Sequence, residues 1–299
     1  MAVFATGLGA PETPRLHPES GWLCVEMAPP RAGITHVSQD GKGLCQIAPA
    51  GCPNGLCIDK YNMIWVADTV PPALLRVDMS GGVETVLTSG DTPSGVSGEF
   101  LLPNDLCFSS NGLLYMTDSG ITMADWVVDG APRPDWESAP FDGKLWEIDT
   151  DEKTARAIDT GLRFANGIAF GPDGNLYVNE MISGDIFRYP VTDGKVSASK
   201  EKFVNVLDSD WPGGFRGPDG MAFSDDGRLW CTVYGEGNIA VVSATGEIVQ
   251  RIKTAGRAPT NVAFGRNGEK RLYVTEHELG QIEVFDVDAK AFSFDGDLF

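Results

Sequence analysis

One hairpin-like segment recurs along the chain, and this repeat limits the possible folds more than any other feature of the sequence. Residues 101–118, LLPNDLCFSSNGLLYMTD, show it clearly, because two apolar runs flank a Ser-Ser-Asn-Gly turn. Alternating apolar residues on either side of an Asn-Gly pair are typical of a β-hairpin. Related segments cover residues 9–27, 51–68, 163–180, 216–233 and 258–276.

Each copy begins with a polar residue that is followed by a short apolar strand. The six polar residues are Glu12, Asn54, Asn104, Asn166, Asp219 and Asn261. Their spacings of 42 to 62 residues leave room for about four strands per repeat, the content of one propeller blade. We therefore expect an all-β, six-bladed β-propeller with four-stranded antiparallel blades, in which residues 1–299 form a single domain. The first copy starts close to the N-terminus, so strands from both chain ends are expected to complete the last blade.

The six polar residues are expected to form a ring, because the first strand of every propeller blade lines the central channel. Two carboxylates and four amides make an all-oxygen set that suits a hard divalent cation, Ca²⁺ above all. Any single one of these residues would also suit a turn that enters a strand. Two buried carboxylates without a cation are costly, which favours the metal site. Strand alternation predicts that Asp105, the neighbour of Asn104, faces away from the channel.

Further charged side chains are expected at the same channel mouth. The second strands end there in acidic residues, at Asp68, Asp118, Glu180 and Glu276. Three arginines precede ring positions and suit either an oxygen-rich substrate or the nearby carboxylates: Arg163, Arg216 and Arg257. His277 suits a general base or a structural role, and the structural role is favoured. We include His277, Asn54 and Asn261 among the candidate substrate contacts.

Two longer connections are predicted to overhang this mouth as lids, at about residues 119–143 and 208–217. The first contains Trp126 and Trp136, and the second contains Trp211 and Phe215. Aromatic side chains in such loops favour a pocket wall over a solvated surface. Trp126 and Trp211 are therefore candidate substrate contacts.

Composition indicates which classes of partner and which cellular compartment to expect. The net charge of −19 disfavours nucleic acid and anionic membranes, and no apolar run approaches the length of a membrane span. The first residues lack the basic and apolar regions of a secretory signal. The six cysteines are then expected to be reduced thiols, and the protein to be cytoplasmic with a small-molecule substrate. A disulfide between Cys45 and Cys52 is the alternative.

Three of the repeats resemble those of a known family. The segments PNDLCFSSNGLLYMTD, ANGIAFGPDGNLY and GPDGMAFSDDGRLW together are similar to the gluconolactonase/regucalcin (senescence marker protein) family. This resemblance implies a six-bladed propeller with a central divalent metal ion, and many members hydrolyse sugar lactones. It implies Glu12, Asn166 and Asp219 as metal ligands, with Asp219 also the general base. Asn104 is implied as a further ligand or a substrate contact.

The sequence departs from the family pattern at two positions. Thr13 replaces a usual glycine, and Leu102 stands where sugar-lactone enzymes of the regucalcin type carry a substrate-binding arginine. The metal ligands are unaffected by these changes, but a sugar-derived substrate is put in doubt. The tryptophan-bearing connections suggest a less polar or larger ring.

The leading hypothesis is a metal-dependent lactonase that converts a lactone, sugar-derived or other, to its hydroxy acid. One divalent ion, Ca²⁺ before Zn²⁺, Mn²⁺, Mg²⁺ or Fe²⁺, acts as a Lewis acid, and Asp219 or Asp118 takes the proton of the attacking water. The alternatives are a phosphotriesterase-like or other ester hydrolase on the same site, and a non-catalytic Ca²⁺-binding propeller. A lyase or condensing enzyme similar to strictosidine synthase is a further alternative and would work without metal.

Overall fold

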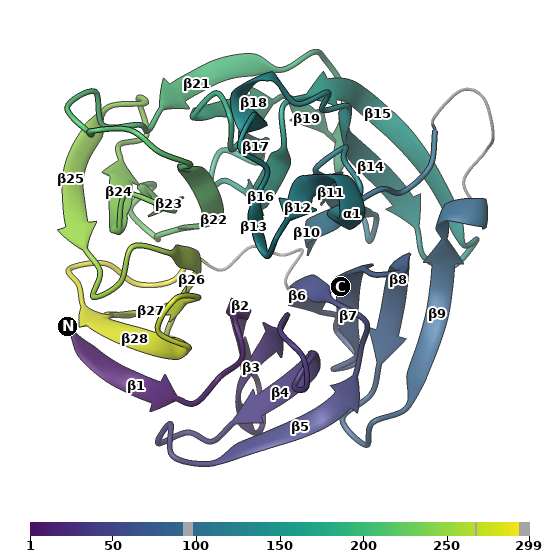
Figure 1. Cartoon of the computed structure of the whole chain (residues 1–299), viewed down its shortest axis with the longest axis horizontal. Coiled ribbons are helices and arrows are strands. Elements are labelled where there is room, and N and C mark those ends of the chain that lie inside the picture. The colour runs from purple at the N-terminus through teal and green to yellow at the C-terminus, as the bar shows by residue number, and fades with distance from the viewer. Residues whose placement is uncertain (92–97, 267, 293–299) are drawn as a thin grey trace.

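Six four-stranded antiparallel sheets surround a central channel, as Figure 1 shows in a view down the shortest axis. This computed structural model describes residues 1–91, 98–266 and 268–292. Each sheet is one blade, whose strands follow each other from the channel to the rim. The predicted six-bladed β-propeller is therefore confirmed.

Blades 1 to 3 form in chain order. Blade 1 consists of β2 (Pro11–His17), β3 (Gly21–Glu26), β4 (Gly33–Val37) and β5 (Leu44–Pro49). Blade 2 consists of β6 (Pro53–Ile58), β7 (Ile64–Thr69), β8 (Pro72–Val77) and β9 (Val83–Thr88). Blade 3 consists of β10 (Pro103–Phe108), β11 (Leu114–Asp118), β14 (Gly143–Asp149) and β15 (Thr154–Leu162).

Blades 4 to 6 continue the same pattern. Blade 4 consists of β16 (Ala165–Phe170), β17 (Leu176–Glu180), β18 (Asp185–Tyr189) and β21 (Glu201–Asn205). Blade 5 consists of β22 (Gly217–Phe223), β23 (Leu229–Tyr234), β24 (Asn238–Val242) and β25 (Ile248–Lys253). Blade 6 consists of β26 (Pro259–Phe264), β27 (Arg271–Glu276), β28 (Gln281–Asp286) and β1 (Ala2–Thr6).

The two ends of the chain close the ring together. Strand β1 pairs with β28, Ala2 opposite Val284 and Thr6 opposite Gln281, so the first strand forms the outer edge of blade 6. This closure, visible in Figure 1 where purple β1 meets yellow β28, confirms the expectation from the first repeat. It ties segments far apart in the sequence into one sheet, and the chain then connects blade 6 to blade 1 because β1 leads into β2.

The repeated turns explain why the hairpins form where the sequence predicts them. In the Ser-Ser-Asn-Gly turn of blade 3, Gly112 has φ +87° and its amide donates to the carbonyl oxygen of Ser109. Glycine adopts this left-handed conformation without a steric penalty. In blade 2 the same place is taken by Asn62, with φ 61°, because asparagine tolerates that region better than other residues with side chains.

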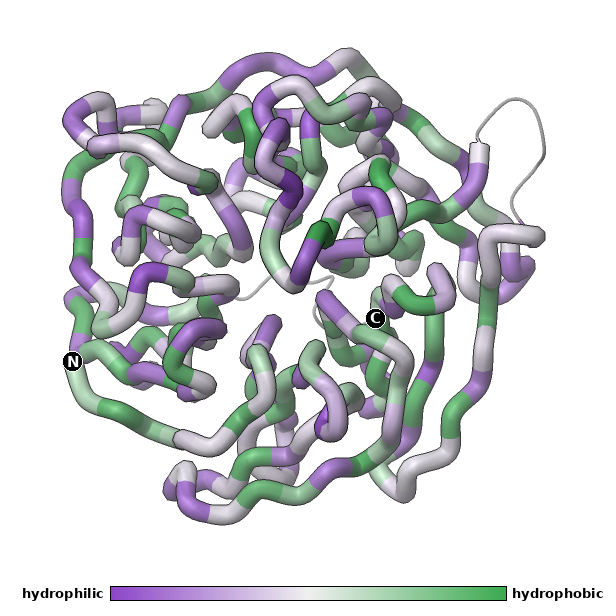
Figure 2. Tube along the Cα trace, in the orientation of Figure 1, coloured by the Kyte–Doolittle hydropathy of each residue, from purple (hydrophilic) through white to green (hydrophobic). Residues whose placement is uncertain are grey.

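The hydrophobic core lies between neighbouring blades, where inner and middle strands bury their large side chains. Trp146 of β14 packs edge-on against Phe100, with ring centroids 4.9 Å apart. Trp230 of β23 packs in the same way against Phe264 of the next blade, at 5.7 Å. Figure 2 shows hydrophobic stretches within the blades and hydrophilic residues recurring at the turns. The blades are therefore held together by aromatic packing as well as by the closure.

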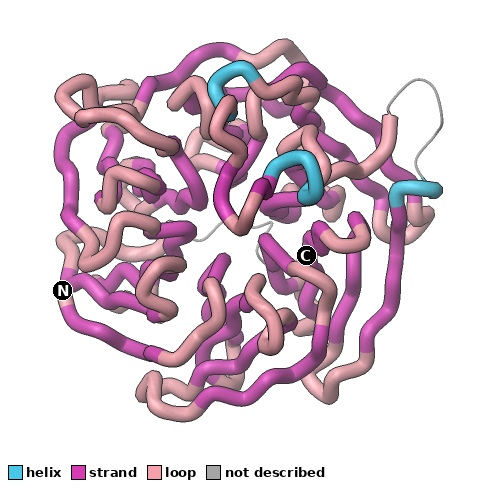
Figure 3. The backbone as a smooth tube through the Cα atoms, in the orientation of Figure 1, coloured by secondary structure: helices cyan, strands magenta, loops and turns pink. Residues whose placement is uncertain are grey.

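The remaining short elements belong to the connections (Figure 3). They are η1 (Ser89–Asp91), α1 (Met123–Trp126), β12 (Val127–Val128), β13 (Ala131–Pro132), η2 (Trp136–Ser138), β19 (Val191–Thr192) and β20 (Lys195–Val196). Within the described ranges, every helix is too short and too polar to cross a membrane. Cys45 and Cys52 are both free thiols, which excludes the alternative disulfide between them.

Candidate metal centre and substrate cavity

Every inner strand has a pairing irregularity at the position of its polar residue. In blade 3, Pro103 pairs with Asp118, and regular pairing resumes only at Leu106 opposite Met116. The other five inner strands shift register in the same region. A bulge of this kind breaks the strict alternation of side chains, so two successive residues in each inner strand are free to face the channel.

The first of these two residues lines a cavity at one channel mouth, called here the mouth cavity. Its volume is about 250 Å³. Five of the six predicted ring residues line it: Glu12, Asn54, Asn104, Asn166 and Asp219. All five are buried, with at most 8% of their surface exposed. The structure thus brings together carboxylates and amides from five blades around one small space.

In blade 6 the cavity is lined by Thr260, and the predicted ring residue Asn261 lies one position further along β26. The pairing explains the difference, since Pro259 opposite Glu276 corresponds to Pro103 opposite Asp118. A signal in the sequence could have found this. In each inner strand, the residue that lines the cavity stands four positions before the last residue of the apolar strand motif. Asn104 has this spacing to Phe108, and Thr260 has it to Phe264.

Hydrogen bonds between neighbouring blades hold the backbone of the ring residues. The Thr117 hydroxyl donates to the carbonyl oxygen of Asn166 at 2.6 Å, and the Asn179 amide donates to that of Asp219 at 2.6 Å. The same link joins Thr13 to Asn54 at 3.1 Å and Thr232 to Thr260 at 2.8 Å. All these groups are buried, and buried hydrogen bonds fix their partners in position. The ring is therefore set by contacts that run around the channel.

The second residue of each bulge forms a layer beneath the ring. Asp105 faces the channel in this layer, which corrects the expectation from strand alternation. Its Oδ2 accepts a hydrogen bond from Nδ2 of Asn261 at 3.3 Å, and its Oδ1 lies 4.0 Å from the Arg15 guanidinium. Glycines fill other places in the layer because the space is taken: a Cβ at Gly220 would lie 1.9 Å from Cγ of Asn261.

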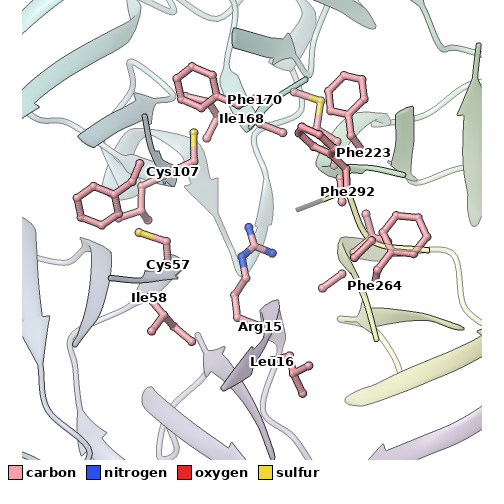
Figure 4. Close-up of a pocket in the computed structure, with 18 of the residues that line it drawn as sticks. Arg15, Leu16, Cys57, Ile58, Cys107, Ile168, Phe170, Phe223, Phe264 and Phe292 are labelled. Atoms are coloured by element: carbon pink, nitrogen blue, oxygen red, sulfur yellow. The ribbon is translucent and has the colours of Figure 1, made fainter. Parts of the chain in front are cut away.

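Arg15 approaches this layer from a second cavity at the opposite end of the inner strands, called here the lower cavity. It has a volume of about 300 Å³. Figure 4 shows the Arg15 guanidinium pointing into its centre, with Phe170, Phe223 and Phe264 at its rim. Asp105 and Asn261 thus lie between the two cavities. The positive charge of Arg15 lies on the lower side, where it lowers the pKa of Asp105 against the dominant effect of burial.

Three carboxylates repel one another around the channel. Burial raises the pKa of Glu12, and the nearby charges of Asp219 and Asp105 raise it further. Burial also raises the pKa of Asp219, followed by the effect of Asp105, while hydrogen bonds from Asn166 and the Gly220 amide lower it. The ring therefore concentrates more negative charge than its own hydrogen bonds compensate.

The donor set fits a hard divalent cation. Glu12 and Asp219 supply carboxylate oxygens, and Asn104 and Asn166 supply amide oxygens to the same cavity. Among the residues that the structure describes, no group of three His, Cys, Asp or Glu side chains forms a metal-type cluster. The candidate ligands combine two carboxylates with amides, a composition that suits Ca²⁺ and other oxygen-preferring ions.

Asp118, the second candidate general base, lies away from the mouth cavity. Its two oxygens accept backbone hydrogen bonds from Leu101 at 2.8 Å, Leu102 at 3.1 Å and Gly120 at 2.8 Å. Asp68 holds the amides of Gly51 and Cys52 in the same manner. These acids at the ends of second strands accept hydrogen bonds from backbone amides of the neighbouring loops. The position of Asp118 therefore fits a structural role.

The connection after Asp118 contributes lining residues to the mouth cavity and forms its roof. The Thr122 hydroxyl caps α1 by accepting a hydrogen bond from the Asp125 amide at 3.1 Å. The hairpin of β12 and β13 then turns at Asp129 and Gly130, both with positive φ, the Asp-Gly turn that two-residue hairpins prefer. The residues of this connection that line the cavity are Met123, Trp126, Val127, Gly130, Ala131 and Pro132.

The two lid connections meet through aromatic packing. Trp126 lies with its ring centroid 4.8 Å from that of Phe164 and 5.1 Å from that of Phe215, which comes from the second connection. Phe164 and Phe215 also line the cavity. Trp136 supports Phe215 from outside, at 5.5 Å. The roof is consequently a connected apolar wall above the polar ring.

Trp211 and the three arginines lie outside the residues that line the mouth cavity. Trp211 stacks against the Arg257 guanidinium, whose carbon lies 5.4 Å from the ring centroid. Arg163 donates to the carbonyl oxygen of Glu137, and Arg216 donates to that of Asp208 and to Glu236. These guanidinium groups brace the loops at the mouth, so the structure favours their structural interpretation.

His277 and Tyr234 add polar groups to the upper wall of the mouth cavity. Their rings meet edge to face, with centroids 6.4 Å apart. Burial lowers the pKa of His277, which favours the neutral imidazole. Burial and the charge of Asp219 raise the pKa of Tyr234 to about 12, so its hydroxyl stays protonated. Both side chains are therefore placed as neutral hydrogen-bonding groups. The sequence pattern did not identify Tyr234 as a residue that lines the cavity.

The fold and the site define a six-bladed propeller with an oxygen-lined centre at one channel mouth. Residues 92–278 match the model of the SMP-30/gluconolactonase/LRE-like region. This match covers more than half of the chain, and the protein belongs to this family.

Individual relatives agree with this membership. A gluconolactonase from Zymomonas mobilis is 27% identical over 265 residues, which cover 85% of this chain and 70% of the relative. A pentonolactonase from Haloferax volcanii is 31% identical over 166 residues, 54% of this chain and 55% of the relative. The chain thus spans about half the length of the second relative. Regucalcin from Agrobacterium tumefaciens, described as a calcium-binding protein, shares the fold with a TM-score of 0.77 at 18% identity, covering 98% of this chain and 95% of its own.

Proposed function

We propose that the protein is a metal-dependent lactonase. The observation that carries the proposal is the pair of buried carboxylates, Glu12 and Asp219, which face a small roofed cavity together with amides from other blades. Family membership and the similarity to a gluconolactonase and a pentonolactonase support the same reaction class. A cytoplasmic location, where Cys45 and Cys52 stay reduced, is part of the proposal.

Glu12, Asn166 and Asp219 would hold one divalent cation, with Asn104 completing the set. Ca²⁺ is the first choice for these oxygen ligands. When bound, the cation supplies Lewis-acid polarisation of the lactone carbonyl. The chain prepares for it through the blade-to-blade hydrogen bonds of Thr117 and Asn179, which fix the backbone of the two central ligands.

The remaining steps belong to the side chains around the cavity. Asp219 takes a proton from the attacking water, which adds to the carbonyl carbon of the lactone. The ring C–O bond then breaks, the ring oxygen takes up the proton that Asp219 removed from the water, and the product is the hydroxy acid. In this proposal Asn54 and Asn104 orient the ester group, and neutral His277 and Tyr234 donate or accept hydrogen bonds above it. The supporting observation is that all four side chains line the mouth cavity.

The test compares two buried aspartates, Asp219, which lines the mouth cavity, and Asp118, which lies outside it. We expect Asp219→Asn to lower kcat for lactone hydrolysis by about 100-fold to 10,000-fold, the usual contribution of a general base. Asp118→Asn, the matched control, removes a buried acid outside the cavity and should keep kcat within a few-fold. Cation binding is measured in parallel by calorimetry. Near-normal turnover of the Asp219 variant would contradict its role, and cation binding without turnover of any lactone would favour a binding protein.

A further inference from the structure

The mouth cavity has two chemically different halves. Its floor carries the carboxylates and amides of the ring, and its upper wall is almost entirely apolar. The apolar lining includes Leu102, Met123, Trp126, Phe164, Met181 and Phe215. Trp126 and Phe164 are 7% and 5% exposed, so these two rings of the wall are packed in place.

Among the described residues, the apolar wall carries no charged side chain. The lining residues of the mouth cavity, as far as the chain is described, include no lysine and no arginine. The three arginines near the mouth are committed elsewhere: Arg163 to Glu137, Arg216 to Asp208 and Glu236, and Arg257 to the carbonyl oxygen of Gly235. A substrate that carries many hydroxyl groups would therefore find few partners in the upper half beyond Tyr234 and His277.

Hydrogen-bonding groups that lose water without gaining a partner are costly to bury. Burying the hydroxyl groups of a polyhydroxylated lactone against Trp126 and Phe215 would weaken its binding. Burying an alkyl or aryl substituent there would strengthen binding. The volume of about 250 Å³ lies just below the range of about 300–1,000 Å³ for drug-sized ligands. The substituent must then be small.

We propose that the site selects small lactones bearing one alkyl or aryl substituent, in preference to sugar lactones. The ester group faces the ring residues, and the substituent lies against the wall formed by Trp126 and Phe215. This inference rests on the proposed lactonase function and deepens it by naming the substrate class.

The test is a series of γ-lactones whose single side chain grows by one methylene at a time, together with a phenyl-substituted γ-lactone and gluconolactone. With the cation-loaded protein, kcat/KM should rise about threefold to fivefold per methylene, the value expected for burial of one such group, until the cavity is full. Gluconolactone should fall about 100-fold or more below the best member of the series. The corresponding γ-lactams, which are not hydrolysed under these conditions, should bind with the same trend in calorimetry.

Two variants connect the trend to the wall. Trp126→Ala and Phe215→Ala should flatten the rise with side-chain length for both hydrolysis and lactam binding. Trp211→Ala, the matched control, removes a tryptophan of the same lid connection as Phe215 that lies outside the cavity and should leave the rise unchanged. Circular dichroism and thermal unfolding establish that each variant is folded, and the lactam series on the unaltered protein tests the proposal even if a variant does not fold.

The possible results separate this inference from the proposed function. Gluconolactone turned over as well as or better than the substituted lactones would overturn the inference and leave the lactonase standing. A flat dependence on side-chain length, or an equal loss in Trp211→Ala, would also overturn it. No hydrolysis of any lactone would overturn the proposed function together with the inference.

Discussion

Asn261 donates a hydrogen bond from Nδ2 to Oδ2 of Asp105 across the channel, at 3.3 Å, although the two residues are 156 positions apart in the chain. Asp105 belongs to blade 3 and Asn261 to blade 6, which lie on opposite sides of the ring. Asn261 also donates to the Thr13 hydroxyl at 3.1 Å. A polar contact directly beneath the candidate metal centre therefore joins blades 1, 3 and 6.

We predict that Asp105→Asn weakens the binding of a divalent cation about 10-fold to 100-fold, the usual effect of altering a group behind metal ligands. The physical reason is the loss of a negative charge that acts on both Glu12 and Asp219. Isothermal titration with Ca²⁺ measures the change, and kcat at saturating cation should fall less than the affinity. Asp118→Asn changes a buried acid in the same way outside this layer; equal affinity losses in the two variants would contradict a specific role for Asp105.

Thr117→Val should destabilise the protein by about 1–3 kcal/mol, the cost of leaving a buried polar group unsatisfied. The hydroxyl donates to the carbonyl oxygen of Asn166 and accepts from the Asp105 amide, and valine has nearly the same shape without either bond. Chemical denaturation measures the loss. Thr117→Ser retains the hydroxyl and should keep most of the stability that Thr117→Val loses. Equal stability of the Val and Ser variants would show that packing dominates at this position.

Asp118→Asn is expected to lower stability while leaving the reaction intact. The carboxylate accepts from the amides of Leu101, Leu102 and Gly120, and an asparagine places an NH₂ group opposite at least one of these donors. The expected cost is about 1–3 kcal/mol, measured by denaturant unfolding. An unchanged unfolding midpoint would show that these hydrogen bonds are dispensable, and a large drop in kcat with normal stability would restore Asp118 as a candidate base.

The cation-free protein should lose stability as the pH rises above about 4, where unfolded carboxyl groups titrate. Burial raises the folded-state pKa of Glu12, Asp105 and Asp219. The charges of Asp219 and Asp105 raise the pKa of Glu12 further, and the charge of Asp105 raises that of Asp219 further. Between the unfolded and the folded pKa values the folded chain binds more protons, so its free energy of unfolding decreases with rising pH across that window.

Thermal unfolding of chelator-treated protein between about pH 5 and about pH 8 measures this effect. The midpoint should fall with rising pH, and added Ca²⁺ should reduce or reverse the fall because a cation compensates the ionised groups. Asp219→Asn removes one charge and should make the cation-free dependence shallower. A midpoint that rises over the same range without cation would contradict the interpretation.

The sequence predicts the architecture well because every repeat carries its own local signals. Turn residues such as Gly112 and alternating strands define each hairpin, and the spacing of the hairpins defines the blade. The closure by β1 followed from the early start of the first repeat. Local signals of this kind act independently in each blade, so the repeat remains recognisable even where one copy is irregular.

The candidate site is predictable only as far as the strands are regular. Five ring residues lie where the repeat predicts them, but the bulge in each inner strand turns Asp105 toward the channel and places Thr260 in the sixth position. The two-residue alternation of side chains along a strand does not predict where such a bulge occurs. The position of a loop tryptophan is equally hidden, and Trp126 lines the cavity while Trp211 stacks on Arg257.

The central claim is that the oxygen ring supports cation-dependent lactone hydrolysis, and the most direct measurement is cation removal and replacement. Proton release is followed for γ- and δ-lactones with chelator-stripped protein, and then with each of Ca²⁺, Mg²⁺, Mn²⁺, Zn²⁺ and Fe²⁺ added singly. We predict that turnover falls to the background rate on stripping and returns with at least one cation, Ca²⁺ first. Full lactonase activity in protein shown by metal analysis to be free of divalent cations would contradict the account.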